Sequence, residues 1–597
     1  MTATPITQRL ARVRDTLKNA SVDALLVPSA DPHLSEYLPA HWQGRQWLSG
    51  FTGSTATLVV TGGFAGLWAD SRYWEQAEAE LKGTDVELMK LAPGQPGPFE
   101  WLGRELPSGG KVAVDGAVLG LAPARALREQ LAPRAIELDL RGDLLGQVWD
   151  ARPGLPGKPV YAHEAPYATE TAASKLARVR EVMVEKNASV HFIATLDDIG
   201  WLFNLRGSDV PYNPVFVAFA LVFPDAAQLF VAPGKLAQPL VAALAAEGVQ
   251  VRPYDAIGQA LSQLPAQSRL LIDPARVTVG LLAQVAGGVE QVEAINPSTL
   301  FKSLKHEADA VHIRRAMEED GAALCEFFAW FEHAQGREAV TEITVDERLT
   351  AARARRPGYV CPSFGTIAAF NGNGAMPHYR ATEASHARIE GNGLLLIDSG
   401  GQYLGGTTDI TRMVPIGEPT LEQKQDCTRV LKGMIALSRA QFPKGILSPL
   451  LDAIARAPLW ADAINYGHGT GHGVGYFMNV HEGPQVIAYQ APPAPHTAMF
   501  AGMITSIEPG TYRPGQWGVR IENLVLAQPV PTAGFGDFLA FETLTLCPID
   551  TRCLLVENLS KEEREWLNGY HRAVNQRLAP LLEGAALAWL QVRTQAI

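Results

Sequence analysis

Residues 391–413 contain two aspartates that each lie next to an apolar run, an unusual place for an acidic side chain. Asp398 follows the run LLLI, and Asp409 precedes ITRM after a turn rich in glycine. Strand, glycine-rich reversal and β-branched strand predict a β-hairpin. A carboxylate in a buried strand costs several kcal/mol unless it is compensated, and two facing carboxylates also repel each other. The hairpin therefore predicts either a divalent cation or arginine and backbone partners.

A second group of polar residues follows about sixty residues downstream. The stretch NYGHGTGHGVGYFMNVHEGP contains three histidines, and two glutamates lie in the apolar contexts ITSIEPGTY and GVRIENLVL. Several carboxylates together with an imidazole form the ligand set expected for a pair of hard to borderline divalent ions. Carboxylates shared between ions about 3.5–4 Å apart can support activation of a bridging water. The residues concerned are His468, His472, His481, Glu508 and Glu522.

In order and local context, these residues resemble the metallopeptidases of the pita-bread fold. The segments DSGGQYLGGTTDITR, GHGTGHGVGYFMNVHEGP, SIEPGTY and GVRIEN are similar to those of the three-domain Xaa-Pro aminopeptidases (aminopeptidase P). The resemblance spans essentially the whole chain. It implies a mixed α/β and α+β architecture, in which two creatinase-like α/β domains precede a pita-bread catalytic domain.

The resemblance also implies a role for each metal ligand. Asp398 chelates one ion, Asp409 and Glu522 bridge both, and His472 ligates one through a neutral nitrogen. Glu508 is a ligand and also accepts a proton from the bridging water. We expect two divalent ions, with Mn²⁺ favoured by the family and Zn²⁺ or Co²⁺ as alternatives. The competing interpretation is a buried polar network without metal.

Four further residues are candidates around the substrate, and the three histidines among them match family positions. His378 and His481 are expected to stabilise the tetrahedral oxyanion or to carry a proton to the leaving nitrogen. The family places His468 beside the proline pocket, although it could equally support a ligand or pack structurally. Arg520 lies two residues before Glu522 on one strand face, so it is predicted to orient that carboxylate or the substrate. A structural histidine, or a simple ion pair for Arg520, is the alternative in each case.

The function implied is a cytoplasmic metallo-aminopeptidase. It releases the first residue of peptides that have proline in the second position, through a hydroxide activated by two metal ions. The exopeptidase limit and the proline preference come from the resemblance alone, and the spacing of the ligands shows neither.

Three alternatives compete with this function. A prolidase has the same metal site, but a chain of this length argues against it. A creatinase-like C–N hydrolase lacks the full carboxylate set, which this chain keeps. A catalytically inactive pita-bread module that binds peptides or proteins is disfavoured by the intact ligands and histidines.

A repeat in the first half of the chain indicates the elements that precede the catalytic domain. The sequence LARVR occurs at 10–14 and again at 176–180, and NASV occurs at 19–22 and 187–190. Each copy is followed by a strand-like run, a tryptophan-containing segment and a glycine-rich turn. We infer a duplicated α/β domain. The predicted domains are 1–157, 158–305 and 306–597.

Two helices are predicted in the last of these domains. Residues 307–335 have helical periodicity, and Lys561 to Leu578 form an amphipathic stretch ahead of Pro580. The second helix is predicted to pack outside the catalytic core. Arg206, in NLRGSDVPYNPVF, is interpreted as part of a domain-interface loop, with a reach toward a catalytic site as the alternative.

Composition excludes several functional classes. The chain has 597 residues and a net charge of −11 without a long basic run, so nucleic acid is not an expected partner. No run approaches the roughly 20 apolar residues of a membrane span, and the N-terminus lacks the apolar core of a signal peptide. Five scattered cysteines argue against a disulfide framework. A homodimer that acts on peptide substrates is expected from the resemblance.

Overall fold

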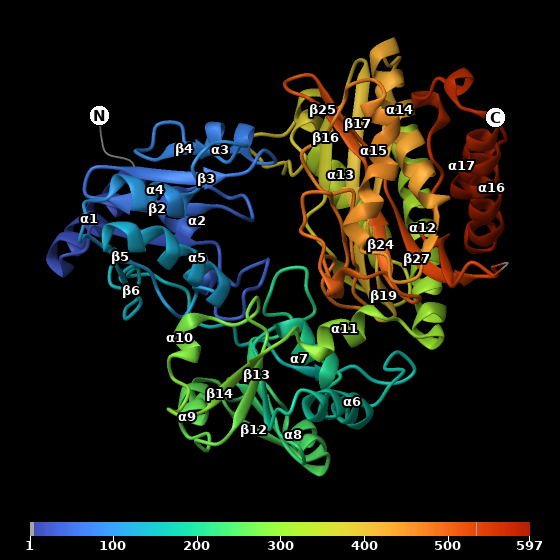
Figure 1. The fold of residues 1–597 in the computed structure, drawn as a ribbon. Helices are drawn as coiled ribbons and strands as arrows, with labels where there is room; N and C mark the ends of the chain where they lie inside the picture. Colours follow the sequence, from blue (N-terminus) through green and yellow to red (C-terminus); the bar gives the residue numbers. More distant parts are fainter. Residues whose placement is uncertain (1–4, 533) are drawn as a thin grey trace. The chain divides into compact units, whose positions relative to one another are not determined.

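The computed structural model describes residues 5–532 and 534–597 and divides into two compact units (Figure 1). The division does not follow the sequence simply, because a short piece from the first half of the chain belongs with the second unit. The first unit consists of Met1–Pro211 and Val215–Ser298, and the second of Tyr212–Pro214 and Thr299–Ile597.

The first unit contains two six-stranded mixed sheets. In the first sheet the strand order is β4-β3-β2-β1-β5-β6, and the apolar strand β1 pairs antiparallel with β2 and parallel with β5. Its elements are α1 (Pro5–Ala20), β1 (Ala24–Pro28), α2 (Gly44–Ser49), β2 (Thr57–Thr61), β3 (Ala65–Ala69), α3 (Trp74–Glu80), β4 (Glu87–Lys90), α4 (Pro98–Glu105), β5 (Lys111–Ala113), α5 (Leu121–Leu131) and β6 (Glu137–Asp139).

The second sheet repeats this arrangement with the order β12-β11-β10-β8-β13-β14. The central strand β8 again has one antiparallel and one parallel neighbour, as expected for the repeated motifs; the boundary at residue 157 stays a prediction. The elements are β7 (Tyr161–Ala162), α6 (Ala172–Glu185), β8 (Val190–Ile193), α7 (Leu196–Leu202), β9 (Leu205–Arg206), β10 (Ala218–Val222), β11 (Ala227–Val231), α8 (Gln238–Ala246), β12 (Val249–Pro253), α9 (Ile257–Ser262), β13 (Arg269–Ile272), α10 (Val279–Leu282) and β14 (Glu290–Glu293).

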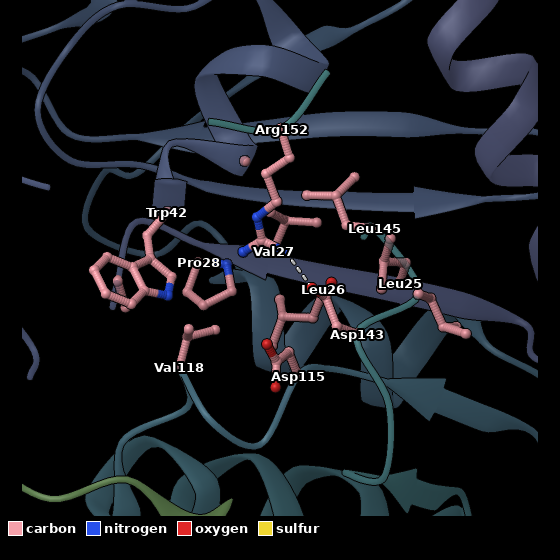
Figure 2. A pocket seen from close by; sticks show the side chains of 13 residues that line it. Leu25, Leu26, Val27, Pro28, Trp42, Asp115, Val118, Asp143, Leu145 and Arg152 are labelled. Atoms are coloured by element: carbon pink, nitrogen blue, oxygen red, sulfur yellow. Dashed lines mark hydrogen bonds and ion pairs between the residues drawn. The ribbon is translucent and has the colours of Figure 1, made fainter. Parts of the chain in front are cut away.

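A small pocket lies beside β1 in the first sheet (Figure 2). Trp42 and the charged side chains of Asp115, Asp143 and Arg152 line it, and Arg152 forms an ion pair with Asp143. Its volume of about 40 Å³ holds a few water molecules but no peptide.

The second unit is built around the predicted hairpin. Strands β17 and β20 pair antiparallel, and β16 adds to the other edge of β17. The glycine-rich reversal is more elaborate than predicted, because its strands β18 and β19 leave the hairpin and form a separate sheet with β15. The strands are β15 (Tyr359–Pro362), β16 (Ile367–Phe370), β17 (Gly393–Ser399), β18 (Gly401–Tyr403), β19 (Gly406–Thr407), β20 (Ile410–Ile416), β21 (Gln441–Pro443), β22 (Gly471–His472), β23 (Val486–Ile487), β24 (Ile504–Ile507), β25 (Gly510–Arg513), β26 (Trp517–Arg520), β27 (Asn523–Val530) and β28 (Phe538–Thr543).

Both predicted helices of this unit are present, as α12 and α16. The amphipathic helix α16 buries Leu567, Val574 and Leu578 in the same apolar core as the hairpin, so the expectation that it packs outside the catalytic core is wrong. None of the described helices is long and apolar enough to cross a membrane. The helices are α11 (Pro297–Ser303), α12 (Glu307–Ala334), α13 (Glu342–Ala354), α14 (Leu421–Ser438), α15 (Asp452–Trp460), α16 (Lys561–Leu578) and α17 (Gly584–Arg593).

The short piece Tyr212–Pro214 connects two loops of the second unit. The carbonyl of Tyr212 accepts a hydrogen bond from Gln402 Nε2 at 3.1 Å, and the same nitrogen donates to the carbonyl of Met478 at 2.6 Å. Thr407 donates to Gln402 Oε1 at 2.8 Å. Tyr212 has a φ of +68°, a left-handed conformation that is uncommon for an aromatic residue. This piece therefore supports both the reversal of the hairpin and the loop that carries the histidines.

Arg206 contacts the backbone of the first unit. Its side chain is buried and donates from Nη1 to the carbonyls of Gly200 and Leu205 at 2.9 and 3.0 Å. These bonds hold the start of the loop that leads to Tyr212.

Candidate metal centre

The hairpin places its two aspartates close together. Asp398 lies near the end of β17, opposite Thr411 of β20, while Asp409 immediately precedes β20. Apolar β-branched and leucine side chains drive both strands into the core, so both carboxylates are buried, with 8% and 4% of their surfaces exposed.

Three other elements bring the remaining predicted ligands to the hairpin. His472 lies in β22, and its backbone N–H donates to Ser506 Oγ of β24 at 2.9 Å. Glu508 follows β24 and donates from its backbone N–H to the Thr470 carbonyl at 2.8 Å. Glu522 lies between β26 and β27, and its Oε2 accepts from the Thr411 hydroxyl at 2.9 Å.

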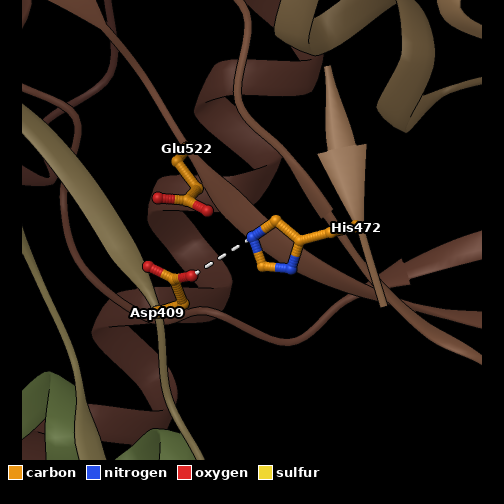
Figure 3. A group of neighbouring side chains, drawn as sticks. All are labelled: Asp409, His472 and Glu522. Atoms are coloured by element: carbon orange, nitrogen blue, oxygen red, sulfur yellow. Dashed lines mark ion pairs between the residues drawn. The ribbon is translucent and has the colours of Figure 1, made fainter. Parts of the chain in front are cut away.

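The side chains converge in a way that suits a metal site. His472 Nε2 lies 3.6 Å from Asp409 Oδ2 and 3.6 Å from Glu508 Oε1. Ligand atoms of Asp409, His472 and Glu522 all lie within 4.8 Å of one another (Figure 3). Imidazole and carboxylate donors at this spacing can share a divalent ion.

Two carboxylate oxygens test whether metal ions fit. Asp398 Oδ1 and Glu522 Oε1 are buried and have no hydrogen-bond partner among the described residues. A buried anionic oxygen without a partner is costly, and a divalent cation would satisfy it. The donor set and these two oxygens therefore fit metal ions.

The electrostatics of the cluster lead to the same conclusion. Burial raises the pKa of Asp409 and Glu508 well above the ordinary value, and the neighbouring carboxylates raise both further. Burial and the charge of Asp398 raise the pKa of Glu522 to about 8. Without cations, these carboxyls resist full ionisation at neutral pH. Positive ions at the centre would offset all three pKa shifts, because they stabilise the charged form of each carboxyl.

Arg520 contacts a different carboxylate from the one expected. Its Nη2 donates to Asp398 Oδ2 at 2.6 Å, and its Nη1 donates to the Tyr512 hydroxyl at 2.7 Å. Glu522 lies beyond the end of β26, where strand alternation no longer applies. Arg520 Nε donates to the Thr411 hydroxyl at 3.3 Å, and this hydroxyl donates to Glu522. The predicted role of Arg520 in orienting Glu522 or the substrate stays a prediction. The Tyr512 hydroxyl also lies 2.7 Å from His468 Nε2. Tyr512, which the sequence analysis missed, thus connects Arg520 to His468.

The other two histidines border the same cluster. The ring of His481 meets the ring of His472 edge to face, with centroids 4.3 Å apart. Next to His378, the carbonyl of Pro377 accepts a hydrogen bond from Arg520 Nη2 at 3.3 Å. The proposed catalytic histidines therefore belong to segments that reach the carboxylates.

Two buried ion pairs, also missed from the sequence, hold these histidine segments. Arg456 pairs with Asp452 and donates from Nη2 to the carbonyl of His468 at 2.6 Å. Lys305 Nζ lies 2.5 Å from Oε1 of Glu482, which follows His481. The Asp-x-x-x-Arg spacing signals a pair on one helix face, but no local pattern indicates which loop it supports.

Four family models match successive parts of the chain. Residues 9–141 and 151–309 each match a creatinase/prolidase N-terminal domain. Residues 311–529 match metallopeptidase family M24, and residues 537–597 match the C-terminal region of peptidase M24. The carboxylates and His472 all lie within the M24 match.

Full-length relatives narrow the family. Aminopeptidase P2 of Arabidopsis thaliana is 37% identical over 99% of this chain and 88% of its own length. The probable Xaa-Pro aminopeptidase P of Laccaria bicolor is 38% identical over 98% of this chain and 92% of its own. The chain belongs to the Xaa-Pro aminopeptidase P family. This confirms the predicted family. It also confirms the prediction that this aminopeptidase P family member is a peptidase.

Solved structures confirm the fold of this aminopeptidase P family member. The X-prolyl aminopeptidase of Caenorhabditis elegans, described as a cytosolic enzyme with a di-nuclear active site, matches all of both chains with a TM-score of 0.95 and 31% identity. A prolidase of Pyrococcus horikoshii matches 63% of this chain with a TM-score of 0.50 and 24% identity, which supports the fold alone. The predicted creatinase-like and pita-bread architecture is confirmed.

After metal removal, the stability of this aminopeptidase P family member is expected to fall as the pH rises from acidic to neutral. A carboxyl whose pKa is higher in the folded than in the unfolded chain stabilises the fold at low pH, and this contribution is lost as the pH rises through the folded pKa. For Glu522 the window runs from about 4.5 to about 8. The melting temperature of the chelated protein should therefore fall between pH 5 and pH 8, and Mn²⁺ should raise it more at pH 8 than at pH 5.

Differential scanning fluorimetry across this pH range measures the effect. The variant Glu522→Gln serves as a control, because it removes one of the titrating carboxyls and should flatten the decline in the chelated protein. A melting temperature of the chelated wild type that climbs steadily from pH 5 to pH 8 would contradict the expected electrostatics.

Proposed function

We propose that this chain is a two-metal Xaa-Pro aminopeptidase. The observation that carries the proposal is the convergence of four carboxylates and His472 from separate segments of the chain, with buried oxygens of Asp398 and Glu522 that lack partners among the described residues. Full-length similarity to aminopeptidases P supports the substrate class.

The ions would be held by the predicted ligand set. When bound, two divalent ions supply Lewis acidity that lowers the pKa of a water and polarises the scissile carbonyl. The ligands are Asp398, Asp409, His472, Glu508 and Glu522.

The side chains supply the proton movements of the reaction. Glu508, 3.6 Å from His472 and raised in pKa by its buried surroundings, accepts the proton of the attacking water. His378 and His481 donate hydrogen bonds to the oxygen of the tetrahedral intermediate or pass a proton to the leaving group. The nitrogen of an Xaa-Pro bond belongs to a tertiary amide, so it must gain a proton before it leaves as an amine.

Two more residues bind the substrate in this proposal. His468, held by Tyr512 and by Arg456, borders the proline pocket. Arg520 keeps Asp398 in place through their ion pair. In this proposal Arg520 also borders the substrate. The preference for proline in the second position rests on similarity to the family.

Three finer features are proposed on the same similarity. We propose Mn²⁺ as the metal, ahead of Zn²⁺ and Co²⁺, and a homodimer as the assembly. A cytoplasmic location is supported by the description of the C. elegans relative as cytosolic. Neither nucleic acid nor membrane is a proposed partner.

Hydrolysis of matched peptides tests the proposal. The chelated protein is assayed with Xaa-Pro-Xaa and Xaa-Ala-Xaa tripeptides before and after addition of Mn²⁺. Release of the first residue from the proline peptide alone, and only with metal, is the expected result.

An Xaa-Pro dipeptide assayed alongside separates the related activities. Cleavage of the dipeptide without cleavage of the tripeptide would indicate a prolidase instead. A folded, metal-loaded protein that cleaves none of the three would favour an inactive peptide-binding module.

A further inference from the structure

The segment from Phe370 to Ala387 carries His378, which the proposed function places at the reacting carbonyl. After Phe370, which ends β16, and apart from a short 3₁₀ turn at Asn371–Ala375, the segment lacks helix and strand. A catalytic group has to be held close to its productive position, because a misplacement of about 1 Å can cost about 100-fold in rate. Something other than secondary structure must therefore fix this loop.

A single buried carboxylate binds the loop on both sides of His378. Glu342, the first residue of α13, is fully buried. Its Oε1 accepts hydrogen bonds from the backbone N–H of Phe370 at 2.7 Å and from Asn373 Nδ2 at 3.0 Å. Its Oε2 accepts from the Tyr379 hydroxyl at 2.8 Å and from the backbone N–H of Ala387 at 2.6 Å.

The four donors make this contact strong. Hydrogen bonds to a charged acceptor are roughly twice as strong as those between neutral groups. The carboxylate is compensated by the donors of this one loop, so the loop and the buried charge stabilise each other. Burial and the bond to Glu342 also raise the pKa of Tyr379, which keeps its hydroxyl protonated as a donor.

The far side of the loop is fixed against the metal centre. Arg520, which pairs with Asp398, donates to the carbonyl of Pro377 at 3.3 Å. Gly374 packs directly on the backbone of β26, because a Cβ atom added at Gly518 would lie 1.7 Å from the Gly374 carbonyl oxygen. The loop is thus held between Glu342 on one side and β26 on the other.

We propose that Glu342 is a positioning residue for Xaa-Pro hydrolysis, which sets the place of His378 relative to the metal centre by clamping the loop at Phe370, Asn373, Tyr379 and Ala387. The inference rests on the proposed function, since it assigns a purpose to the position of His378. Glu342 does not touch the substrate itself.

The first test is the isosteric variant Glu342→Gln. Its side-chain NH₂ group replaces one accepting oxygen and would face hydrogen-bond donors of the loop, so these bonds are lost. We expect kcat for an Xaa-Pro-Xaa tripeptide to fall about 10- to 100-fold, with metal content and KM close to wild type. The matched control is Glu347→Gln, which changes an exposed glutamate of the same helix and should leave kcat unaltered. Unaltered kcat in folded Glu342→Gln would overturn the proposal.

A double-mutant cycle separates positioning from general structural support. If Glu342 acts through His378, Glu342→Gln should have little further effect on kcat in a His378→Ala background. If the two single-variant losses in kcat multiply in the double variant, Glu342 acts independently of His378, and the proposal is overturned.

A readout without catalysis keeps the test independent of the proposed function. Hydrogen–deuterium exchange should be faster in peptides covering 370–387 in Glu342→Gln than in Glu347→Gln, with the exchange of β17 and β20 unchanged. Equal exchange in both variants would overturn the clamp. If the wild type cleaves no Xaa-Pro peptide, the proposed function fails, and the exchange result still decides whether Glu342 holds the loop.

A milder change covers the case in which Glu342→Gln does not fold. Tyr379→Phe removes one of the four donors and no charge. It should accelerate exchange in the same segment and lower kcat by a smaller factor than Glu342→Gln, and wild-type values for both quantities would overturn the proposal.

Discussion

Glu508→Gln will lower kcat for an Xaa-Pro tripeptide by about 10² to 10⁴-fold, the usual contribution of a general base. Glutamine keeps the shape of the side chain and one carbonyl oxygen for a metal, but it cannot accept a proton. Backbone bonding to Thr470 fixes the position of residue 508 independently of its side chain, so the variant should fold. Steady-state kinetics combined with metal analysis measures the loss.

The control for this variant is Glu557→Gln, an exposed glutamate of the same unit. It should match wild type in both kcat and metal content. Activity of Glu508→Gln within tenfold of wild type, at full metal content, would assign the proton transfer to another residue.

Asp409→Asn will abolish activity and at the same time stabilise the metal-free protein. Asp409 is proposed to bridge both ions, so its loss should remove at least one of them, which mass spectrometry of the native protein can count. In the absence of metal, the same change removes a buried carboxyl that must either carry a charge facing Glu522, Asp398 and Glu508 or take up a proton. Relief of like-charge repulsion should raise the melting temperature above that of the chelated wild type at pH 8.

A loss of activity together with a gain in the stability of the metal-free protein distinguishes a functional cluster from a structural one. The control is Asp225→Asn, a substitution at an exposed residue of the first unit, which should change neither the activity nor the melting temperature. If Asp409→Asn instead lowered the melting temperature of the metal-free protein, Asp409 would be part of a polar network that stabilises the fold without metal.

The sequence was informative where a local pattern had a single physical explanation. Asp398 after four apolar residues could be predicted on a buried strand, and the long periodic stretch from Glu307 could be predicted as a helix, found as α12. The duplicated motifs predicted two similar sheets, and these share one strand order.

Contacts between distant segments left no local signal. Glu342 follows a threonine at a helix start, where an acidic residue is expected to favour the helix dipole, so nothing suggested its bonds to Phe370 and Ala387. Arg520 was predicted to orient Glu522 or the substrate, by alternation along a strand that ends at Arg520 itself. In both cases the partner is chosen by the fold and lies far away in the sequence.

The attachment of Tyr212–Pro214 to the second unit has a consequence for engineering. A fragment that begins at Thr299 contains the whole M24 match but lacks the carbonyl that Gln402 binds. Gln402 is completely buried, so such a fragment would open a polar gap between the hairpin reversal and Met478. A transplantable catalytic module of this protein is therefore discontinuous in the gene, and any minimal version must supply those three residues from outside the M24 segment.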